Sequence, residues 1–475
     1  MRNKLGQIGL IVAGVVIGVA ISLNFSAVAQ RESASRAQLP LPIEELRAFT
    51  EVFGKVKQDY VEPVEDKKLI TEAINGMLTG LDPHSAYLDQ EAFREMQVST
   101  QGKFGGLGIE VGMEDGFVKV ISPIDDTPAS RAGVMAGDLI VKLDDLAVKG
   151  LTLNDAVKQM RGKPDTKIRL TIVRKGEANP LEITLTRAII EIQSVKSTTL
   201  EPGYAYFRVT QFQEGTGELL ARAIETHVKG SMKGIILDLR NDPGGLLTSA
   251  VAVTAMFVDS GKLVVYTDGR AEDSKMRLNA SPEHYLRRNS EDFVRKLPAE
   301  IRKLPMVVLV NGGSASASEI VAGALQDHNR AVIMGQQTFG KGSVQTILPL
   351  GNNTAIKLTT ARYYTPNGRS IQAKGITPDI PLESAIDKNA SLRLREADLT
   401  KHLEEGTSAA PVTKDAKDAE KEKAVAVAQA KYNFAPEARP EIDPKELRPN
   451  PGEVVSKKDY ELNQAVAFLK SRAGT

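Results

Sequence analysis

The chain of 475 residues contains no cysteine and only five histidines. Without cysteine it can form no disulfide, no thiolate metal site and no cysteine nucleophile. No two histidines have the spacing of a helical zinc motif such as H-E-x-x-H. We therefore expect neither a bound metal nor a cofactor. The five histidines are His84, His227, His284, His328 and His402.

The chain also lacks an excess of charge of either sign. Its 61 Lys and Arg residues stand against 60 Asp and Glu residues, which gives a formal net charge of +1. Proteins that bind nucleic acid usually carry a strongly basic face, so we expect no nucleic acid among the partners. The hydrophobic content of 41% is enough to fill the cores of about three domains, at about 150 residues per domain.

The first 29 residues follow the order of an export signal. Arg2 and Lys4 give a basic start, residues 5–23 are apolar, and A-V-A at 27–29 has the small-x-small form that a signal peptidase cleaves. The apolar run is also long enough for an uncleaved membrane anchor, because about 20 apolar residues span a bilayer. With either a signal peptide or an anchor, we expect the rest of the chain in the periplasm or cell envelope.

Beyond this start, the pattern of apolar residues divides the chain into four segments. In the first segment, apolar residues at helical spacing predict helices. The pattern of the second predicts short strands around one helix, and that of the third predicts strands mixed with helices. The fourth is a linker rich in Ala, Lys, Glu and Asp at 405–430, followed by a helix. After 1–29, the predicted segments are 30–101, 102–187, 188–385 and 386–475.

A glycine-rich loop opens the second of these segments. F-G-G-L-G-I at 104–109 precedes a strand. Such a loop can turn backbone N–H groups toward a carboxylate, while the free edge of the strand pairs with an extended peptide. The alternative is an ordinary tight turn. The candidate peptide-binding residues are Gly106, Leu107, Gly108 and Ile109.

A turn of small residues in the third segment carries candidate nucleophiles. An apolar strand at 306–310 leads into N-G-G-S-A-S-A-S-E-I, and residues at helical spacing follow. A serine in a strand-to-helix turn exposes its Oγ near N–H groups that can receive an oxyanion. Ser314, Ser316 and Ser318 all qualify by position. The nearest histidine, His328, would lie about 18 Å from Ser316 along a helix, so it is not the base.

Lys341 is the candidate base. The surrounding G-Q-Q-T-F-G-K-G-S resembles a phosphate-binding loop, but Gly342 replaces the required Ser or Thr and a strand-like stretch follows instead of a helix. A helix leading away from the serine turn and a strand returning over a similar distance bring Lys341 back to that turn. Burial beside apolar residues would lower the pKa of the lysine. A surface lysine in a glycine turn is the alternative.

These motifs resemble those of the carboxyl-terminal processing peptidases, or tail-specific proteases. Ser316 of the serine turn and Lys341 of T-F-G-K-G-S-V-Q are 25 positions apart in the sequence. Three further motifs occur in the order of that family. They are G-L-D-P-H-S-A-Y-L at 80–88, D-L-R-N-D-P-G-G at 238–245 and A-R-Y-Y-T-P-N-G-R-S-I-Q at 361–372.

The resemblance implies a set of catalytic roles. Ser316 would be the nucleophile, Lys341 the general base and Gln345 the residue that orients the base. The oxyanion donors would be the N–H of Ala317 and one glycine N–H. The candidates for that glycine are Gly244 and Gly245.

The resemblance also implies the architecture and the activity. The fold would be α/β, with a crotonase-like protease core, a PDZ-like domain at 102–187 and terminal helical segments. The chain would be a serine endopeptidase of the cell envelope that recognises and cleaves near the C-terminus of protein substrates. Arg161 matches an arginine that couples peptide binding to activity in some relatives. Asp327 also matches an implicated position, but helix geometry places it about 16 Å from the serine hydroxyl, and we interpret it as structural.

The expected partners are protein or peptide C-termini, an envelope adaptor protein and further copies of the chain, joined through the terminal helices. A different class of function is the alternative, namely a catalytically silent PDZ-type scaffold that only binds chain ends. That alternative would need the serine or the lysine to be replaced, and both are present.

Overall fold

The computed structural model describes residues 41–472 except 125, 228–231, 289, 384–393, 405–430, 438–439 and 441–452. The predicted export signal at 1–29 and the charged linker at 405–430 lie outside the described residues. No helix in the described part of the chain is long and apolar enough to cross a membrane.

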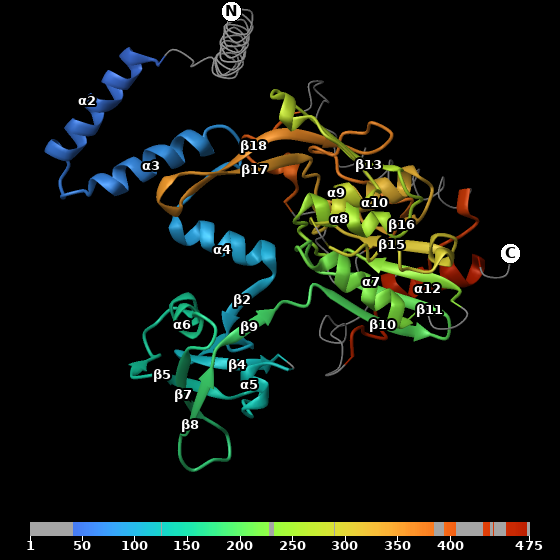
Figure 1. Ribbon diagram of the computed structural model, residues 1–475, viewed down its shortest axis with the longest axis horizontal. Coiled ribbons are helices and arrows are strands. Elements are labelled where there is room, and N and C mark those ends of the chain that lie inside the picture. Colours follow the sequence, from blue (N-terminus) through green and yellow to red (C-terminus); the bar gives the residue numbers. More distant parts are fainter. Residues whose placement is uncertain are drawn as a thin grey trace, which may run out of the picture. The chain divides into compact units, whose positions relative to one another are not determined.

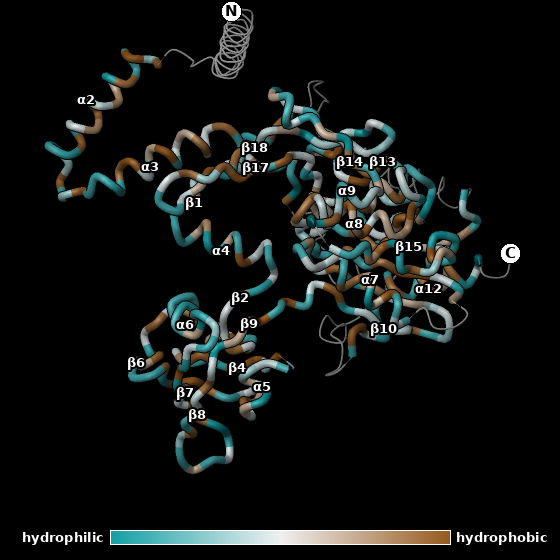
Figure 2. The backbone as a smooth tube through the Cα atoms, in the orientation of Figure 1, coloured by the Kyte–Doolittle hydropathy of each residue, from teal (hydrophilic) through white to brown (hydrophobic). Residues whose placement is uncertain are grey.

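One compact unit of the chain lies at the N-terminus and extends to Ala73. It contains helix α2 (Ile43–Asp59) and the start of α3 (Asp66–Thr79), as the helical period predicted. No residue of α2 is buried. Hydrophobic and hydrophilic residues alternate along this helix (Figure 2), and its large apolar side chains are exposed, among them Phe49 and Val52.

A small antiparallel sheet forms the predicted second segment (Figure 1). Its strands follow one another in the order β3-β4-β5-β7-β8, and α6 (Leu153–Met160) begins at Thr152, whose side chain accepts the N–H of Asp155. Within the described residues β3 pairs only with β4, so its outer edge is open. The strands are Ile109–Glu114, Phe117–Pro123, Leu139–Leu143, Lys167–Val173 and Leu181–Thr186.

The largest body of the molecule is built on a sheet whose strands follow the order β10-β11-β12-β15-β16-β19. All pairs are parallel except β10 with β11. Every residue of β12 and β15 is buried, as expected of strands covered on both faces. The bounds are Val195–Glu201, Tyr204–Val209, Gly234–Asp238, Met306–Val310, Val332–Gly335 and Ile380–Pro381.

Helices cover both faces of this sheet. Alternate residues of β12 point to opposite sides, so Ile235 packs in one core cluster and Ile236 in the other. Helices α7 (Thr216–His227), α8 (Leu247–Ala255) and α10 (Ala317–Asp327) contribute to the first cluster. Helix α12 (Tyr460–Arg472) contributes to the second, which confirms the predicted C-terminal helix.

A second sheet brings distant segments together. Its strands β17 and β18 form a long hairpin (Figure 1), and β1 pairs with β18 so that Ala86 lies opposite Lys357. The G-L-D-P-H-S segment just before β1 is thereby placed beside β18, the strand that also pairs with β17, which follows Lys341. The strands are Ala86–Leu88, Leu263–Gly269, Arg277–Asn279, Ser343–Pro349 and Ala355–Tyr364.

Short elements connect the two sheets to the small domain. Helix α4 (Gln90–Gln101) follows β1 and ends at Gly102. Strand β2 (Lys103–Gly106) then pairs with β9 (Ala188–Glu191), so the chain enters and leaves the small domain through one two-stranded ribbon.

Candidate active site

Of the three candidate serines, only Ser316 is not buried. Ser314 and Ser318 are fully buried, and their hydroxyls donate to the carbonyl oxygens of Leu239 and Asp242. Ser316 is partly exposed and stands directly before α10 with φ 54° and ψ −111°. Residues other than glycine rarely adopt this conformation, and strain of this kind concentrates at functional sites. The geometry is that of a strand-to-helix turn that presents a nucleophile.

Glu319 connects the serine turn to the loop that carries Lys341. Its side chain is fully buried. One carboxylate oxygen accepts the Ser316 N–H at 2.8 Å and the Lys341 N–H at 2.9 Å, while the other accepts the Gly340 N–H at 2.7 Å and the Thr338 hydroxyl. Burial raises the pKa of Glu319 to about 7, against the effect of these hydrogen bonds. Glu319 was not among the residues predicted for the site, although S-x-x-E at a helix start is the pattern of a capping box.

Lys341 has the environment expected of a base. Burial lowers its pKa to about 8, with the carboxylates of Glu396, Glu319 and Asp82 acting in the opposite direction. Its Nζ donates a hydrogen bond to Oε1 of Gln345. No hydrogen bond between Lys341 Nζ and Ser316 Oγ is present in the described residues, and catalytic hydrogen bonds often form only when substrate is bound.

Tyr363 lies between the two predicted catalytic residues. Its hydroxyl donates to the carbonyl oxygen of Lys341 and is hydrogen-bonded to the Ser316 side chain. Burial raises the pKa of this phenol, so the ring stays neutral. The loop then runs directly into β17 rather than into a helix, which excludes the phosphate-binding loop.

The backbone distinguishes between the two candidate glycines. Gly244 donates its N–H to Oδ1 of Asp242 at 2.8 Å, so that group is already bonded. The N–H groups of Gly245 and Ala317 have no acceptor among the described residues. The Gly244 carbonyl accepts the Phe212 N–H, and a trans peptide directs the following N–H to the opposite side. Of the two glycines, only Gly245 therefore has an N–H group without an acceptor among the described residues.

Gly244 is nevertheless essential to the shape of the site. It has φ +97°, and a Cβ atom there would lie 2.7 Å from the Ala315 oxygen and 2.8 Å from the Ala317 nitrogen. Only glycine allows the two loops to approach this closely.

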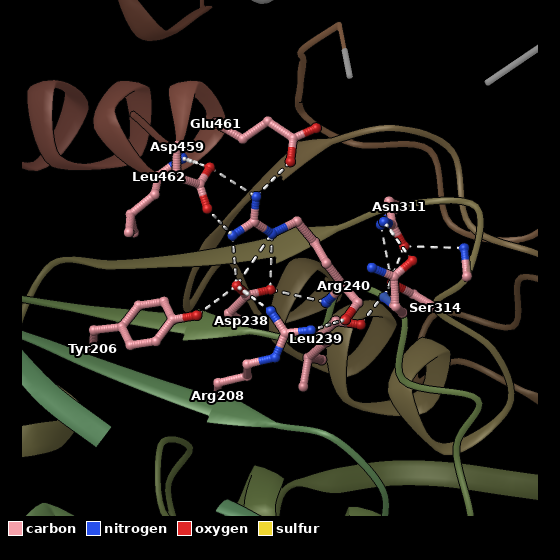
Figure 3. Close-up of polar contacts among 12 residues, drawn as sticks. Tyr206, Arg208, Asp238, Leu239, Arg240, Asn311, Ser314, Asp459, Glu461 and Leu462 are labelled. Atoms are coloured by element: carbon pink, nitrogen blue, oxygen red, sulfur yellow. Dashed lines mark hydrogen bonds and ion pairs between the residues drawn. The ribbon is translucent and has the colours of Figure 1, made fainter. Parts of the chain in front are cut away.

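Polar contacts hold the glycine loop on both sides (Figure 3). On one side, Asn311 exchanges hydrogen bonds with Asn241 at 2.9 and 3.1 Å. On the other side, the buried guanidinium of Arg240 pairs with Asp238 of β12 and with Asp459 and Glu461 at the start of α12. The loop is thus fixed between the serine turn and the C-terminal helix.

The predicted peptide-binding loop has free donors. The Leu107 and Gly108 N–H groups have no acceptor among the described residues, while their carbonyls accept the N–H groups of Ala129 and Ile124. Gly106 ends β2 and Ile109 begins β3, the strand with the open edge. The Arg161 guanidinium lies 4.8 Å from the centre of the Phe104 ring. The structure therefore places Arg161 at this loop and shows no contact of Arg161 with Ser316.

The other candidates have structural contacts. His328 bonds to the carbonyl of Leu263 through Nε2. Asp327 pairs with Arg369 and accepts the N–H of Asn367. Nε2 of His84 contacts both carboxylate oxygens of Glu396 at 2.9 Å. The described residues contain no cluster of side chains that could hold a metal ion.

Sequence comparisons identify relatives for each part of the chain. The sequence model of peptidase family S41 matches residues 203–382, that of the PDZ domain matches 105–185, and that of the activating protease CtpB N-terminal domain matches 15–92. The carboxy-terminal-processing protease of Bartonella bacilliformis is 47% identical over 417 residues, which cover 85% of this chain and 92% of that protein.

Two further similar proteins have lower sequence identity. The carboxy-terminal processing protease CtpA of Bacillus subtilis is 33% identical over 84% of this chain and 81% of its own length. A solved structure of a photosystem II D1 C-terminal processing protease is 31% identical over 70% of this chain and 86% of that chain, with a TM-score of 0.40.

Proposed function

The chain belongs to peptidase family S41 and is a carboxyl-terminal processing protease of the serine type, and we propose that Ser316 is its nucleophile and Lys341 its general base. The observation that carries this assignment is the buried carboxylate of Glu319, which binds the backbone of both residues. The proposal of a catalytically silent scaffold is not supported, because the relatives that cover the chain are named as proteases.

In the proposed reaction, neutral Lys341 accepts the Ser316 proton while Oγ attacks the scissile carbonyl carbon. The N–H groups of Ala317 and Gly245 receive the oxyanion. Protonated Lys341 then gives its proton to the leaving amine, and water hydrolyses the acyl-enzyme. Gln345 accepts a hydrogen bond from Nζ and thereby points the lysine toward the site.

The PDZ domain is the proposed binding site for the C-terminus of the substrate. A terminal carboxylate would accept the free N–H groups of Leu107 and Gly108, and the residues before it would pair with the open edge of β3. Two features support this role, namely the unpaired donors of the loop and the absence of a strand beyond β3 in the described residues.

We propose the periplasm or cell envelope as the location, supported by the basic start, apolar run and A-V-A triplet of residues 1–29. An adaptor protein and self-association remain part of this proposal. The exposed apolar residues of α2 support an interaction through the N-terminal helices.

The test compares cells that carry the wild-type protein with cells that carry Ser316→Ala. Envelope proteins are identified by mass spectrometry together with their C-terminal peptides. We expect a set of proteins to accumulate with longer C-termini in the Ser316→Ala cells. Identical C-termini in both cells would contradict the assigned nucleophile, and fractionation of the protease with the cytosol would contradict the proposed location.

A further inference from the structure

The G-L-D-P-H-S segment contains a buried acidic residue, Asp82, whose two carboxylate oxygens both accept hydrogen bonds. Asp82 is 4% exposed. Its Oδ1 accepts the N–H groups of His84 at 2.8 Å and Ser85 at 2.9 Å, and its Oδ2 accepts the Ser85 hydroxyl at 2.7 Å. Burial opposes ionisation, but hydrogen bonds from Ser85, His84 and Thr359 hold the pKa of Asp82 below its usual value. Asp82 is therefore a carboxylate, which only accepts hydrogen bonds.

A series of hydrogen bonds leads from Asp82 to the base. The Thr359 hydroxyl donates to Asp82 Oδ1 at 3.1 Å, and Nε2 of Gln345 donates to the Thr359 oxygen at 3.1 Å. Oε1 of Gln345 then accepts from Nζ of Lys341. We name these four residues the lysine-orienting network.

The chemistry of each member fixes the direction of the next. A threonine hydroxyl has one proton, and the carboxylate of Asp82 takes it. The Thr359 oxygen can then only accept, so it selects the NH₂ end of the Gln345 amide. The opposite end, Oε1, must therefore face Lys341. Ser343 supports the same orientation, because its hydroxyl oxygen accepts the second proton of Nε2 at 3.0 Å.

We propose that Asp82 and Thr359 are positioning residues that fix the Gln345 amide with its oxygen toward Lys341. The inference rests on the proposed role of Lys341 as the base. It assigns a purpose to a motif more than 250 positions away in sequence from the lysine, and it explains why β1 is paired to β18 at this point.

Other charged groups also face Lys341. Glu396, which lies in a short 3-10 turn (Glu396–Asp398), and Glu319 of α10 favour the charged lysine, as does Asp82, whereas Lys357 of β18 disfavours it. Glu396 is itself held by His84 and Gln372. A test that leaves all these charges in place is therefore preferable, and Thr359→Val does so, because it removes a hydroxyl at nearly constant shape.

The matched control is Thr360→Val. Thr360 is the next residue of the same strand, is equally half-buried, and its hydroxyl bonds to Thr346 rather than to the network. The purified full-length variants are compared on a fluorescently labelled unfolded casein, with kcat/KM measured from pH 6 to 10. Thermal melting shows that each variant is folded.

We expect Thr359→Val to lower the plateau of kcat/KM about tenfold or more, because a misdirected catalytic group is costly. The rising limb should move to lower pH, because an amide oxygen that no longer faces Nζ ceases to stabilise the charged lysine. Thr360→Val should change neither value, and Thr359→Ser, which restores the hydroxyl, should recover the activity.

A double-mutant cycle separates this route from a general loss of structure. In a Gln345→Ala background, Thr359→Val should lower kcat/KM less than about twofold, because its effect depends on Gln345. An equal loss of kcat/KM in the wild-type and Gln345→Ala backgrounds, or no loss in either, would overturn the proposal. If Thr359→Val does not fold, Thr359→Ala, which also removes the hydroxyl and leaves every charge in place, is tested in the same cycle with the same criteria. Full activity in Ser316→Ala or Lys341→Arg would instead overturn the proposed function itself.

Discussion

At the scale of single residues, Lys341 must lose a proton to act as a base, and this separates it from a fixed positive charge. Lysine can do so when it is desolvated, whereas arginine keeps its charge at every working pH. We predict that Lys341→Arg is as inactive as Lys341→Ala or Ser316→Ala, with kcat/KM lowered by at least about 10³-fold. The measurement is cleavage of an unfolded protein substrate, with circular dichroism as the control for folding. A folded and active Lys341→Arg enzyme would show that the lysine supplies only charge.

The pH dependence of the activity follows from the lowered pKa of Lys341. Only the neutral lysine accepts the serine proton, so kcat/KM should rise with pH through about 8 and level off above it. Glu396 raises this pKa by favouring the charged lysine. Glu396→Gln should therefore move the rising limb to lower pH, while Glu272→Gln, in an exposed pair with Lys275, should leave it in place. A limb that moves upward or stays unchanged in Glu396→Gln would refute the assignment of that limb to Lys341.

Sequence reasoning reached some residues of the site and missed others for a physical reason. Local patterns gave three candidate serines and one candidate lysine, and the family resemblance selected Ser316 and Lys341 among the alternatives. Glu319 carried a local signal as well, the S-x-x-E pattern, but its contacts with the lysine loop depend on the tertiary fold. Asp82 and Glu396 act across more than 50 positions of intervening chain, and no local period reports such contacts.

At the scale of elements, the site is a junction between two loops that follow parallel strands. The turn after β15 carries Ser316 and the turn after β12 carries Gly244, and strand pairing places these turns side by side. The apolar run at 306–310 and the strand returning toward Lys341 were predicted and correspond to β15 and β16. The hairpin of β17 and β18 was only partly predicted, because β18 is half-buried along its length and has no clear alternation.

Because the two loops are so close at this junction, we expect one methyl group added at Gly244 to lower the activity strongly. Gly244→Ala would place Cβ within 2.8 Å of the serine turn at a φ of +97°, so the loops must separate and the oxyanion donors move apart. We predict a loss of kcat/KM of about 10²-fold or more. Gly312→Ala is the control, since a Cβ atom there meets nothing within 4 Å. Equal activity of the two variants would mean that the close approach does not matter for catalysis.

At the scale of the whole molecule, helix α12 joins the end of the chain to the strand that leads into the glycine loop. Asp459 forms two hydrogen bonds with the buried Arg240 guanidinium, whereas Lys470 and Glu201 form an exposed pair between the same helix and β10. Asp459→Ala leaves Arg240 paired with Asp238 and Glu461 but removes two charged hydrogen bonds from the buried guanidinium. We predict that Asp459→Ala lowers the free energy of unfolding by about 2 kcal/mol, and that Glu201→Ala lowers it by less than about 1 kcal/mol. Urea unfolding monitored by circular dichroism measures both, and similar losses would contradict the special role of Arg240.

The proposed peptide-binding loop and Ser316 belong to different folded parts of the protease, so recognition of the chain end and cleavage can be tested separately. If the N–H groups of Leu107 and Gly108 bind the terminal carboxylate, its negative charge is what they recognise. Amidation of the substrate's C-terminus removes that charge and should lower kcat/KM about tenfold, chiefly through KM, since the contact is made equally before and during the reaction. Gly108→Ala should reduce the preference for the free carboxylate, because the added Cβ would lie 2.2–2.4 Å from the Thr127 side chain at a φ of +77° and displace the donors. Equal cleavage of free and amidated substrates by the wild-type enzyme would leave the PDZ domain without a role in recognising chain ends.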